Sequence, residues 1–334
     1  MSALPESAGL LILPHLRIQN ANAISSPLTH GFPSITAFLG LMWALERKLA
    51  GKYPVLFDGV GVICHAFQEQ VTDGGYTHAF RLTRNPVDKD GSTAAIVEEG
   101  RIHLDITLVF GLSGNIVNHD DGQRDAFARE VADAVSQMRV AGGSVLPSAR
   151  APWLTRPQCM SIAQDAGEAA SRFRQLRRRW LPGFALVCRD DLLHQRTAAL
   201  QAIGPTATAL DAWLDLSRFN WRPQPADATG NSPPDGASSA KVEWRHDRSE
   251  GWIVPIPVGY GALSALYPRG EVAHARDPLT PFRFVESLYS IGQWLSPHRL
   301  QSWRDLLWYG HTDVEAGVHR ARNDYTPALS VFPN

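Results

Sequence analysis

Alternating apolar and polar residues predict a strand over residues 10–18, the first clear pattern in the chain. Pro14 cannot donate a hydrogen bond to a neighbouring strand, so we expect a bulge or an unpaired position there. A helix is predicted over 35–49, because apolar residues cover most of its circumference and Ser34 can cap its first turn. That helix should be buried.

The segment between this strand and this helix, residues 17–34, is dense in small hydrogen-bonding side chains and is interrupted by Pro27, Gly31 and Pro33. Such a sequence favours neither a helix nor a long strand. Because ordered elements flank it, we interpret it as a functional loop. Arginine can contact phosphate, and amide and hydroxyl groups can contact the edges of unstacked bases. The candidate RNA-binding residues here are Arg17, Gln19, Asn20, Asn22, Ser25 and Ser26.

Two more strands and an insertion follow the first helix. A long strand is predicted from about 55 to 71, and a turn at 73–75 leads it into a partner strand over 78–83. Residues 84–100 mix turn sequences with a short apolar centre, and the clearest alternation in the chain comes next, at 102–110. The insertion is therefore expected to project from a hairpin.

The last elements of this half are an amphipathic helix over 123–138 and a return strand over 139–146. The order strand, helix, strand, strand, helix, strand predicts an α+β, RRM-like (ferredoxin-like) domain over residues 1–150. In such a domain two helices cover one face of the sheet, and the other face stays free to bind. On that free face we expect His15, Arg17 and Gln19.

The remainder, residues 151–334, is predicted to be a mostly helical, mixed extension. Within 161–180, an apolar stripe is flanked on both sides by arginines, which predicts a helix that packs on the protein and exposes positive charge. The stripe consists of Phe173, Leu176 and Trp180, and the arginines include Arg174, Arg177 and Arg178. These three arginines are candidates for contact with backbone phosphates.

Proline positions dominate the other predictions for this half. A helix over 209–218 precedes a proline-rich stretch at about 222–241, which we predict to be a disordered loop. Two prolines limit the strand at 252–258 to an edge position at best. The pairs at 280–281 and 296–297 each match an N-cap residue followed by proline, so each predicts the start of a helix.

Composition adds mainly exclusions. The chain has 334 residues, 44% of them hydrophobic and 19% charged, with a net charge of −1, so nucleic-acid binding would have to come from local patches. The 3 cysteines form no CxxC pair, which predicts neither a disulfide framework nor a zinc site. No membrane segment or secretory leader is apparent, so we expect a cytoplasmic protein. We also expect no metal or other cofactor.

Catalysis is the competing interpretation. A histidine beside Arg17 can cleave RNA by general acid–base chemistry without a metal ion, and His15, His30 and His65 lie in or near the predicted sheet. Hydrogen-bonded structural histidines, or histidines that contact RNA, are the more common alternative. The sequence contains no GxSxG, P-loop, GxGxxG or HExxH pattern.

Six blocks of sequence, in order and spacing, resemble the second subunits of the type I-F CRISPR surveillance complex, the Csy complex. The blocks are LLILPHLRIQNANAISSPLTHGFPS (10–34), LTRNPVDKDGSTAAIVEEGRIHL (82–104), RVAGGSVLP (139–147), RRRWLPGFALV (177–187), WIVPIPVGYGALSALY (252–267) and WLSPHRLQSWRDLLWY (294–309). The resemblance covers nearly the whole chain. It excludes the proline-rich loop and the tail after about residue 310.

That resemblance implies a RAMP-superfamily protein with an RRM-like core and a projecting thumb, here at about 84–101. Its members resemble non-catalytic scaffold subunits that pair with the large subunit and hold the 5′ handle of the guide RNA, beside the backbone subunits of the complex. Target DNA would be met only indirectly, because base pairing with the guide selects it. The thumb residues expected to hold the handle are Arg84, Asn85 and Lys89.

Two alternatives remain open from the sequence. Some relatives in the RAMP superfamily are metal-independent endoribonucleases that cut the guide precursor, and a histidine with a positioned partner on the free sheet face would favour that activity. The other alternative is an adaptor that contacts only protein. In every case, the tryptophan-rich second half is the expected interface with the large subunit.

Overall fold

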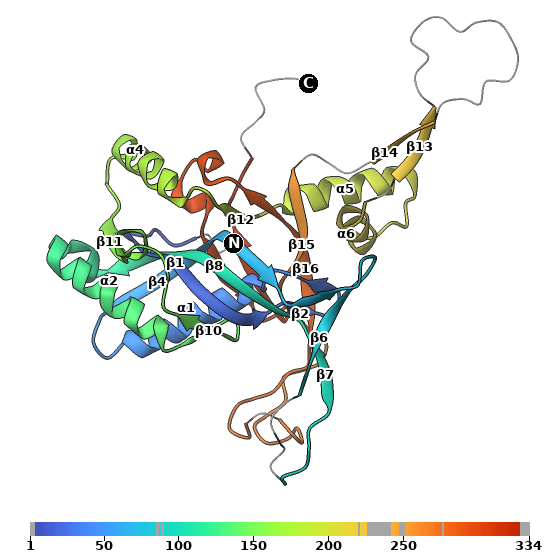
Figure 1. The fold of residues 1–334 in the computed structure, drawn as a ribbon, viewed down its shortest axis with the longest axis horizontal. Helices are drawn as coiled ribbons and strands as arrows, with labels where there is room; N and C mark the ends of the chain where they lie inside the picture. The colour runs from blue at the N-terminus through green and yellow to red at the C-terminus, as the bar shows by residue number, and fades with distance from the viewer. Residues whose placement is uncertain are drawn as a thin grey trace, which may run out of the picture.

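A computed structural model describes residues 4–84, 87, 90–219, 221–225, 242–246, 251–275 and 277–327 (Figure 1). Its main feature is an 11-stranded sheet, together with three small sheets. The large sheet consists of β1 (Gly9–Asn22), β4 (Val55–Glu69), β8 (Arg101–Gly114), β9 (Arg139–Val140), β10 (Gly143–Leu146), β11 (Gln158–Ser161), β12 (Phe184–Cys188), β15 (Trp252–Ala262), β16 (Val285–Leu295), β17 (Trp308–Asp313) and β18 (Val318–Asn323).

The small sheets and the helices surround these strands. The small sheets pair β2 (Ile24–Ser26) with β3 (Thr29–His30), β5 (Val71–Asp73) with β6 (His78–Arg84) and β7 (Ile96–Glu99), and β13 (Trp221–Pro225) with β14 (Val242–His246). The α-helices are α1 (Ile35–Leu49), α2 (Asp121–Ser136), α3 (Pro152–Thr155), α4 (Ala166–Leu176), α5 (Asp190–Ile203) and α6 (Ala209–Ser217). The 3₁₀ helices are η1 (Asn115–Asn118), η2 (Arg177–Trp180), η3 (Pro297–Arg299) and η4 (Trp303–Asp305).

Strands of the second half of the chain close on β4 as a ring. The strand order is β12-β16-β15-β18-β17-β4-β8-β1-β10-β9, and β12 also pairs directly with β4. Phe184 of β12 lies opposite Cys64, and Trp308 of β17 lies opposite Val60, so both ends of this C-terminal set of strands meet the same strand. Because every pairing here is antiparallel, the ring is held by ordinary ladder hydrogen bonds.

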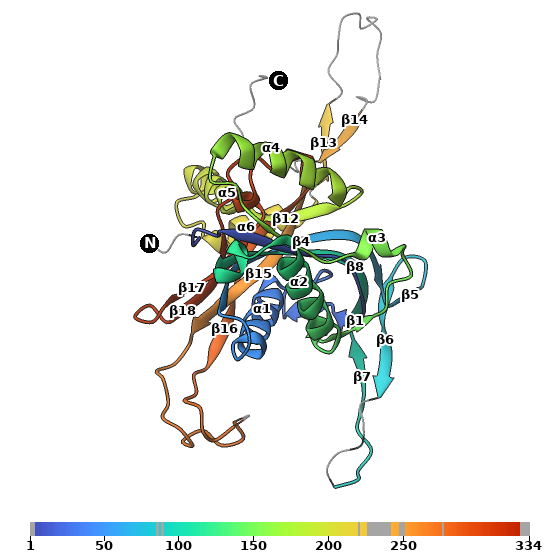
Figure 2. The ribbon, with the colours of Figure 1, turned by 90° about the vertical axis from the view of Figure 1, so that its left-hand side faces the viewer.

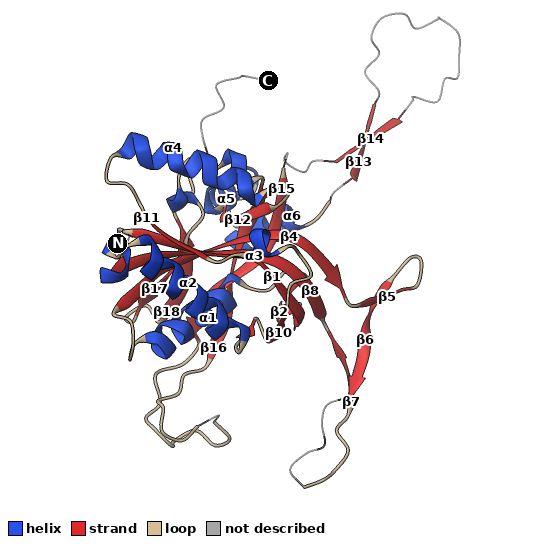
Figure 3. Cartoon of the chain, turned by 60° about the vertical axis from the view of Figure 1, so that its left-hand side comes forward, coloured by secondary structure: helices blue, strands red, loops and turns tan. Residues whose placement is uncertain are grey.

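The predicted fold class is therefore wrong. The chain does not form an RRM-like domain followed by a mostly helical extension, because strands from both halves belong to one large antiparallel sheet (Figure 3). The segment after residue 280 shows why. Its N-cap and proline pair precedes β16 and not a helix, since 285–295 form a strand between β12 and β15 whose second half, 290–295, is buried. Whether residues 1–150 and 151–334 fold as separate domains stays a prediction.

Individual elements of the first half were predicted more accurately. The strands and the helix predicted before residue 84 are present, and Ser34 caps α1 by accepting a hydrogen bond from the Thr36 backbone N–H at 3.3 Å. The predicted pairing differs, because the long strand β4 pairs with β8 and only the short β5 forms a hairpin with β6. The helix predicted at 123–138 is α2, whose inner face buries Phe127, Val131 and Val135. These elements depend on local spacing, which a sequence records directly.

Both faces of the central strands are covered, although unequally. Helices α1 and α2 lie on one side, and α4 lies on the other (Figure 2). On the α4 side, Phe173, Leu176 and Trp180 are buried against Leu10 and Ile12 of β1, as the apolar stripe predicted. The expectation of one wholly free sheet face is thus wrong, and only the part beyond the reach of α4 stays open.

Two arms project from this body (Figure 1). One is the β6–β7 hairpin, whose position agrees with the predicted insertion. The arm is longer than predicted, because β6 also pairs with β5 before the insertion begins. The other is the β13–β14 ribbon, which corrects the start of the predicted disordered loop, since 222–225 pair with 242–245 as strands. The rest of that predicted loop, 226–241, lies outside the described residues.

The remaining local predictions divide. The segment 252–258 is part of β15, which pairs with β16 along its length but with β18 only at 259–261, so its two prolines lie where the strand has a single neighbour, as expected. The pair at 296–297 begins only the short 3₁₀ helix η3. Among the described residues, none of the helices combines the length and the apolar character that crossing a bilayer would require.

Candidate nucleic-acid interface

The open part of the central sheet contains a polar hollow of about 580 Å³ between β1, β4, β8 and the segment after β10. We use the name polar hollow for the residues that line it, chiefly His15, Arg17, Gln19, Gln68, His103, Asp105 and Arg150. Arg17 and Gln19 are exposed there, whereas Asp105 is largely covered. Two of the predicted RNA-binding residues thus meet polar groups that come from three other segments.

A bulge in β1 sends these side chains into the hollow. Between Leu13 and Leu16, two residues of β1, Pro14 and His15, face one residue of β8, Thr107, and His15 adopts φ 52°. Its backbone N–H donates to Thr107 Oγ1 at 3.2 Å, which replaces the missing ladder hydrogen bond. The bulge predicted at Pro14 is therefore confirmed.

The bulge also corrects the predicted faces of the strand. One extra residue reverses the alternation, so Arg17 lies on the same side as Leu10 and Ile12 and not on that of Leu11 and Leu13. A second irregularity follows between Ile18 and Ala21, where Asn20 adopts φ 56°. The Asn20 backbone N–H donates to His103 Nδ1 at 3.1 Å.

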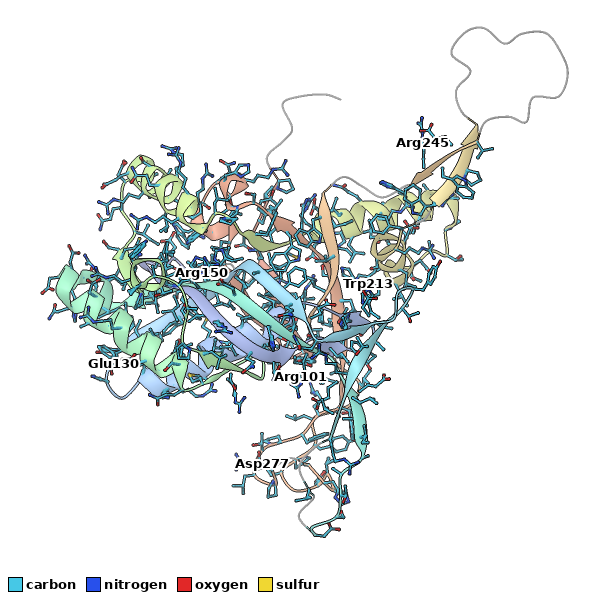
Figure 4. The ribbon with its side chains drawn as sticks, in the orientation of Figure 1. Arg101, Glu130, Arg150, Trp213, Arg245 and Asp277 are labelled. Atoms are coloured by element: carbon cyan, nitrogen blue, oxygen red, sulfur yellow. The ribbon has the colours of Figure 1, made fainter. Side chains whose placement is uncertain are left out.

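Asp105 holds the hollow together. Its Oδ1 accepts from His15 Nδ1 at 2.9 Å, and its Oδ2 accepts from Arg150 Nε at 2.9 Å, with Arg150 Nη2 at 2.7 Å. The guanidinium is thereby fixed on a carboxylate, yet 44% of the Arg150 side chain stays exposed beside the central strands (Figure 4). Arg150 escaped the sequence interpretation because no local pattern distinguishes it.

His65 of β4 lies next to His15, outside the lining of the hollow, and has no free ring nitrogen. Its Nδ1 donates to the Pro182 carbonyl at 2.7 Å, and its Nε2 accepts from the Thr107 hydroxyl at 2.7 Å. The ring lies 4.1 Å from that of His15, centroid to centroid. Burial lowers the pKa of His65, and the neighbouring His15 and Arg150 lower it further, against the effects of Pro182 and Asp105.

The other loop residues hold the loop itself. Asn22 exchanges hydrogen bonds with the backbone of Ile24, at 2.6 Å and 3.2 Å. Ser25 Oγ accepts from the Ser34 backbone N–H at 2.9 Å, and buried Ser26 shares a 2.6 Å hydrogen bond with the Thr29 hydroxyl. Asn22 and Ser25 line a different hollow, next to α1, so the structure separates them from Arg17.

The remaining predicted residues lie in two further regions. Arg84 is exposed at the end of β6, on the arm, and Asn85 and Lys89 lie outside the described residues. On α4 and η2, which cover another part of the same sheet face, Arg174 and Arg178 are exposed, whereas Arg177 is half-buried and donates to the Leu300 carbonyl. Burial, together with Arg174 and Arg178, lowers the pKa of Arg177.

The described part of the chain contains no set of side chains suited to bind a metal ion. No three His, Cys, Asp or Glu side chains there are grouped as a metal ion would require. The cysteines Cys64, Cys159 and Cys188 are each buried and unpaired with one another, and burial raises the pKa of each thiol, to about 12, about 11 and about 12 respectively.

The fold and the hollow together define a sheet-rich protein with two projecting arms and an open polar face. A family model described as CRISPR-associated protein (Cas_Csy2) matches residues 11–321. The chain therefore belongs to the CRISPR-associated Csy2 family. It is 48% identical over 317 residues to the CRISPR-associated protein Csy2 of Pseudomonas aeruginosa (strain UCBPP-PA14), and the match covers 93% of this chain and 94% of that relative. The expected membership of a CRISPR-associated Csy family is confirmed.

Proposed function

We propose that this chain is a non-catalytic, RNA-binding structural subunit of a type I-F CRISPR effector complex, acting in the cytoplasm. It would hold the 5′ handle of the guide RNA together with the large subunit, next to the backbone subunits. The observation that carries the proposal is the polar hollow, in a chain of the Csy2 family. Arg17 and Gln19 are exposed there beside Arg150. Together these three residues place two guanidinium groups and an amide on one open surface.

Each group has a suitable chemical role. Arginine presents a planar fork of donors to phosphate, and an amide can both donate to and accept from a base edge. Asp105 already neutralises part of the Arg150 charge, which limits nonspecific attraction while it orients the guanidinium. Arg17 would therefore be the main phosphate contact and Gln19 and Asn20 the contacts to bases.

The other predicted residues would support this grip from outside the hollow. Arg84, Asn85 and Lys89 would hold the arm against the handle, while Arg174 and Arg178 would contact phosphates elsewhere. Arg177 is better suited to fixing the helix, since it is half-buried and bound to the Leu300 carbonyl. Asn22, Ser25 and Ser26 would fix the conformation of the loop, and the loop would contact the RNA.

A division of labour along the chain follows from these roles. Residues before about 150 would carry the RNA contacts, and the tryptophan-rich part after it would meet the large subunit, where exposed aromatic side chains make effective anchors. Exposed aromatic residues on the β13–β14 ribbon, such as Trp221 and Trp244, suit that contact.

Geometry favours binding over cleavage. General acid–base cleavage needs histidine nitrogens that can exchange protons with the substrate, and both nitrogens of His65 are already bonded. His15 does have a positioned partner in Asp105, so a direct test is warranted. We expect no site-specific cleavage of repeat-containing precursor RNA by the purified protein in EDTA. Cleavage that disappears in His15→Ala would overturn the non-catalytic assignment.

The binding test compares handle RNA affinity of the chain, co-purified with the large subunit, before and after Arg17→Ala combined with Gln19→Ala. We expect a clear loss of affinity, because both side chains are exposed and line the hollow. Arg129→Ala, an exposed arginine on α2, is the matched control and should bind normally. Unchanged affinity in the double variant would favour an adaptor that contacts only protein.

A further inference from the structure

A second pocket, of about 480 Å³, lies next to the polar hollow and is lined by aromatic rings together with aliphatic residues and prolines. We call it the aromatic pocket. The rings on its walls belong to His30, Phe32, His65, Phe67, Phe184, Trp252 and Trp294. Ala66 and Phe67 of β4 line both this pocket and the polar hollow, so the two cavities adjoin at that strand.

The pocket exists because β15 loses a neighbour where its prolines lie. Pro255 and Pro257 line the pocket, in the stretch of β15 that pairs with β16 but not with β18. The loop after β3 closes the gap, since the Ser34 hydroxyl donates to the Pro257 carbonyl at 3.1 Å. Gly31 in that loop has φ 118°, a conformation that favours glycine.

The rings divide into a fixed floor and an exposed wall. Trp294 is 8% exposed and packs edge to face against Phe32, with centroids 4.8 Å apart. Trp252 is 44% exposed and Phe184 42%, with their centroids 5.2 Å apart, and Phe67 is 54% exposed. Large side chains that stay this exposed around one cavity are typical of a binding site and not of a core.

We propose that the aromatic pocket accepts one unstacked nucleobase of the guide RNA, a proposal that rests on the function proposed above. Single-stranded RNA is commonly recognised by bases that leave the stack and pack on aromatic side chains. Phosphate held at Arg17 in the polar hollow would leave the adjoining nucleotide next to Phe67, at the shared wall. Glu69 also lines the pocket and can accept a hydrogen bond from an exocyclic amino group, which favours adenine, cytosine or guanine.

A nucleobase fits these observations better than an apolar side chain of a protein partner. The walls combine flat rings with polar groups at Glu69 and His30, and a base needs both a stacking surface and hydrogen-bond partners. An aliphatic side chain would leave those polar groups uncompensated on binding. Aliphatic occupation is nevertheless a distinct outcome that the experiment separates.

The experiment is a double-mutant cycle that combines substitutions of Trp252 with removal of single bases from the RNA. Handle RNA in which each nucleotide in turn is replaced by an abasic residue is titrated against wild type, Trp252→Phe and Trp252→Leu, each co-purified with the large subunit. Loss of one base–aromatic stack weakens binding by about 10-fold. We expect one abasic position to cause that loss in wild type and in Trp252→Phe, but to cause none in Trp252→Leu, which already binds intact RNA about 10-fold more weakly.

Two controls keep the result interpretable. Tyr76→Leu, an exposed aromatic residue in the turn between β5 and β6, should behave as wild type, and thermal melting should show that Trp252→Leu stays folded, since Trp252 is 44% exposed. If RNA binds but the effect of every abasic position is the same in wild type and in Trp252→Leu, the nucleobase pocket is overturned and the proposed function stands. Unchanged affinity in Trp252→Leu would likewise overturn it, since an apolar occupant is the one that leucine can still accommodate. Failure of every form to bind RNA would overturn both proposals.

Discussion

The polar hollow and the aromatic pocket share a wall on β4 but are built by different means. The hollow lies on three neighbouring strands joined by the β1–β8 and β4–β8 ladders, and its side chains are fixed by the Asp105 network. The pocket lies where β15 lacks a second partner, and its rings are fixed by contacts with one another. One site is therefore organised by hydrogen bonds and the other by packing.

This difference predicts different kinds of binding energy. Contacts of arginine with phosphate weaken as salt rises, because binding releases condensed counterions. Stacking of a base on an aromatic ring depends much less on salt. A nucleic acid that spans both sites would thus be held by two terms that can be measured separately.

The largest expected effect compares a core tryptophan with a pocket tryptophan. Trp308 is 0% exposed, and its Nε1 donates to the Leu186 carbonyl at 2.8 Å inside the ring of strands. Trp308→Ala should reduce the free energy of unfolding by about 3–5 kcal/mol, through a cavity and an unsatisfied carbonyl. Urea titration measures this loss, and Trp252→Ala should show a much smaller one.

Similar losses of stability in both variants would contradict the distinction between core and pocket, because the Trp252 ring would then contribute to the core. A small loss for Trp252→Ala with a large one for Trp308→Ala would support the distinction. Large aromatic residues that contribute little to stability are those a protein retains for function.

The second effect concerns the network of the polar hollow. Asp105→Ala leaves the Arg150 guanidinium and the His15 ring without their shared acceptor, and the Asp105 side chain is only 20% exposed. We expect a loss of about 1–2 kcal/mol in unfolding free energy, since a covered donor that loses its partner is costly. Thermal or urea unfolding checks the value. Unchanged stability would mean that the hollow is not organised by this carboxylate.

Local elements of this fold were predictable, and the orientation of β1 was not. Its strand and its bulge follow from alternation and from Pro14, which are properties of neighbouring residues. Which face carries Arg17 depends on one extra residue at His15, whose φ of 52° no spacing rule indicates. A one-residue bulge reverses the side chains that follow it, here as far as the second irregularity between Ile18 and Ala21, so strict alternation would put Arg17 on the face of Leu11 and Leu13.

Long-range pairing accounts for the larger error. The contact between Phe184 and Cys64 joins segments more than a hundred residues apart, and the sequence of neither strand specifies its partner. Arg150 was missed for the same reason, because only the fold brings it to Asp105. The aromatic pocket was missed because its rings come from β4, β12, β15, β16 and the loop after β3.

The third effect is electrostatic. Arg17→Gln should lower the slope of log affinity against log salt by about 0.7, because a single-stranded nucleic acid then has one phosphate fewer neutralised by the protein. Trp252→Leu should weaken binding without changing that slope. Titrations of handle RNA at several salt concentrations measure both. A reduced slope in Trp252→Leu would contradict the separation of the two sites.

The smallest effect is a pH dependence at the wall between the two sites. Burial lowers the pKa of His65 in the folded protein, whereas the unfolded chain titrates near the ordinary value of about 6.5. Below that value the unfolded state binds more protons, so the contribution of His65 to stability is complete above about pH 6.5 and is lost as pH falls towards the lowered pKa. Asp105 opposes this effect, and His15 and Arg150 add to it.

Urea unfolding at pH 7.5 and pH 5.5 tests the prediction, and His65→Gln should lose less stability between the two than wild type does. His319→Gln is the matched comparison, because burial and His311 also lower the pKa of His319, far along the chain in β18. A pH dependence that His319→Gln removes and His65→Gln leaves intact would assign it to the C-terminal strands. In the neutral form Nε2 of His65 accepts from the Thr107 hydroxyl. Protonation should reverse that hydrogen bond and place a positive charge beside His15 and Arg150, which should loosen the polar hollow and the aromatic pocket together.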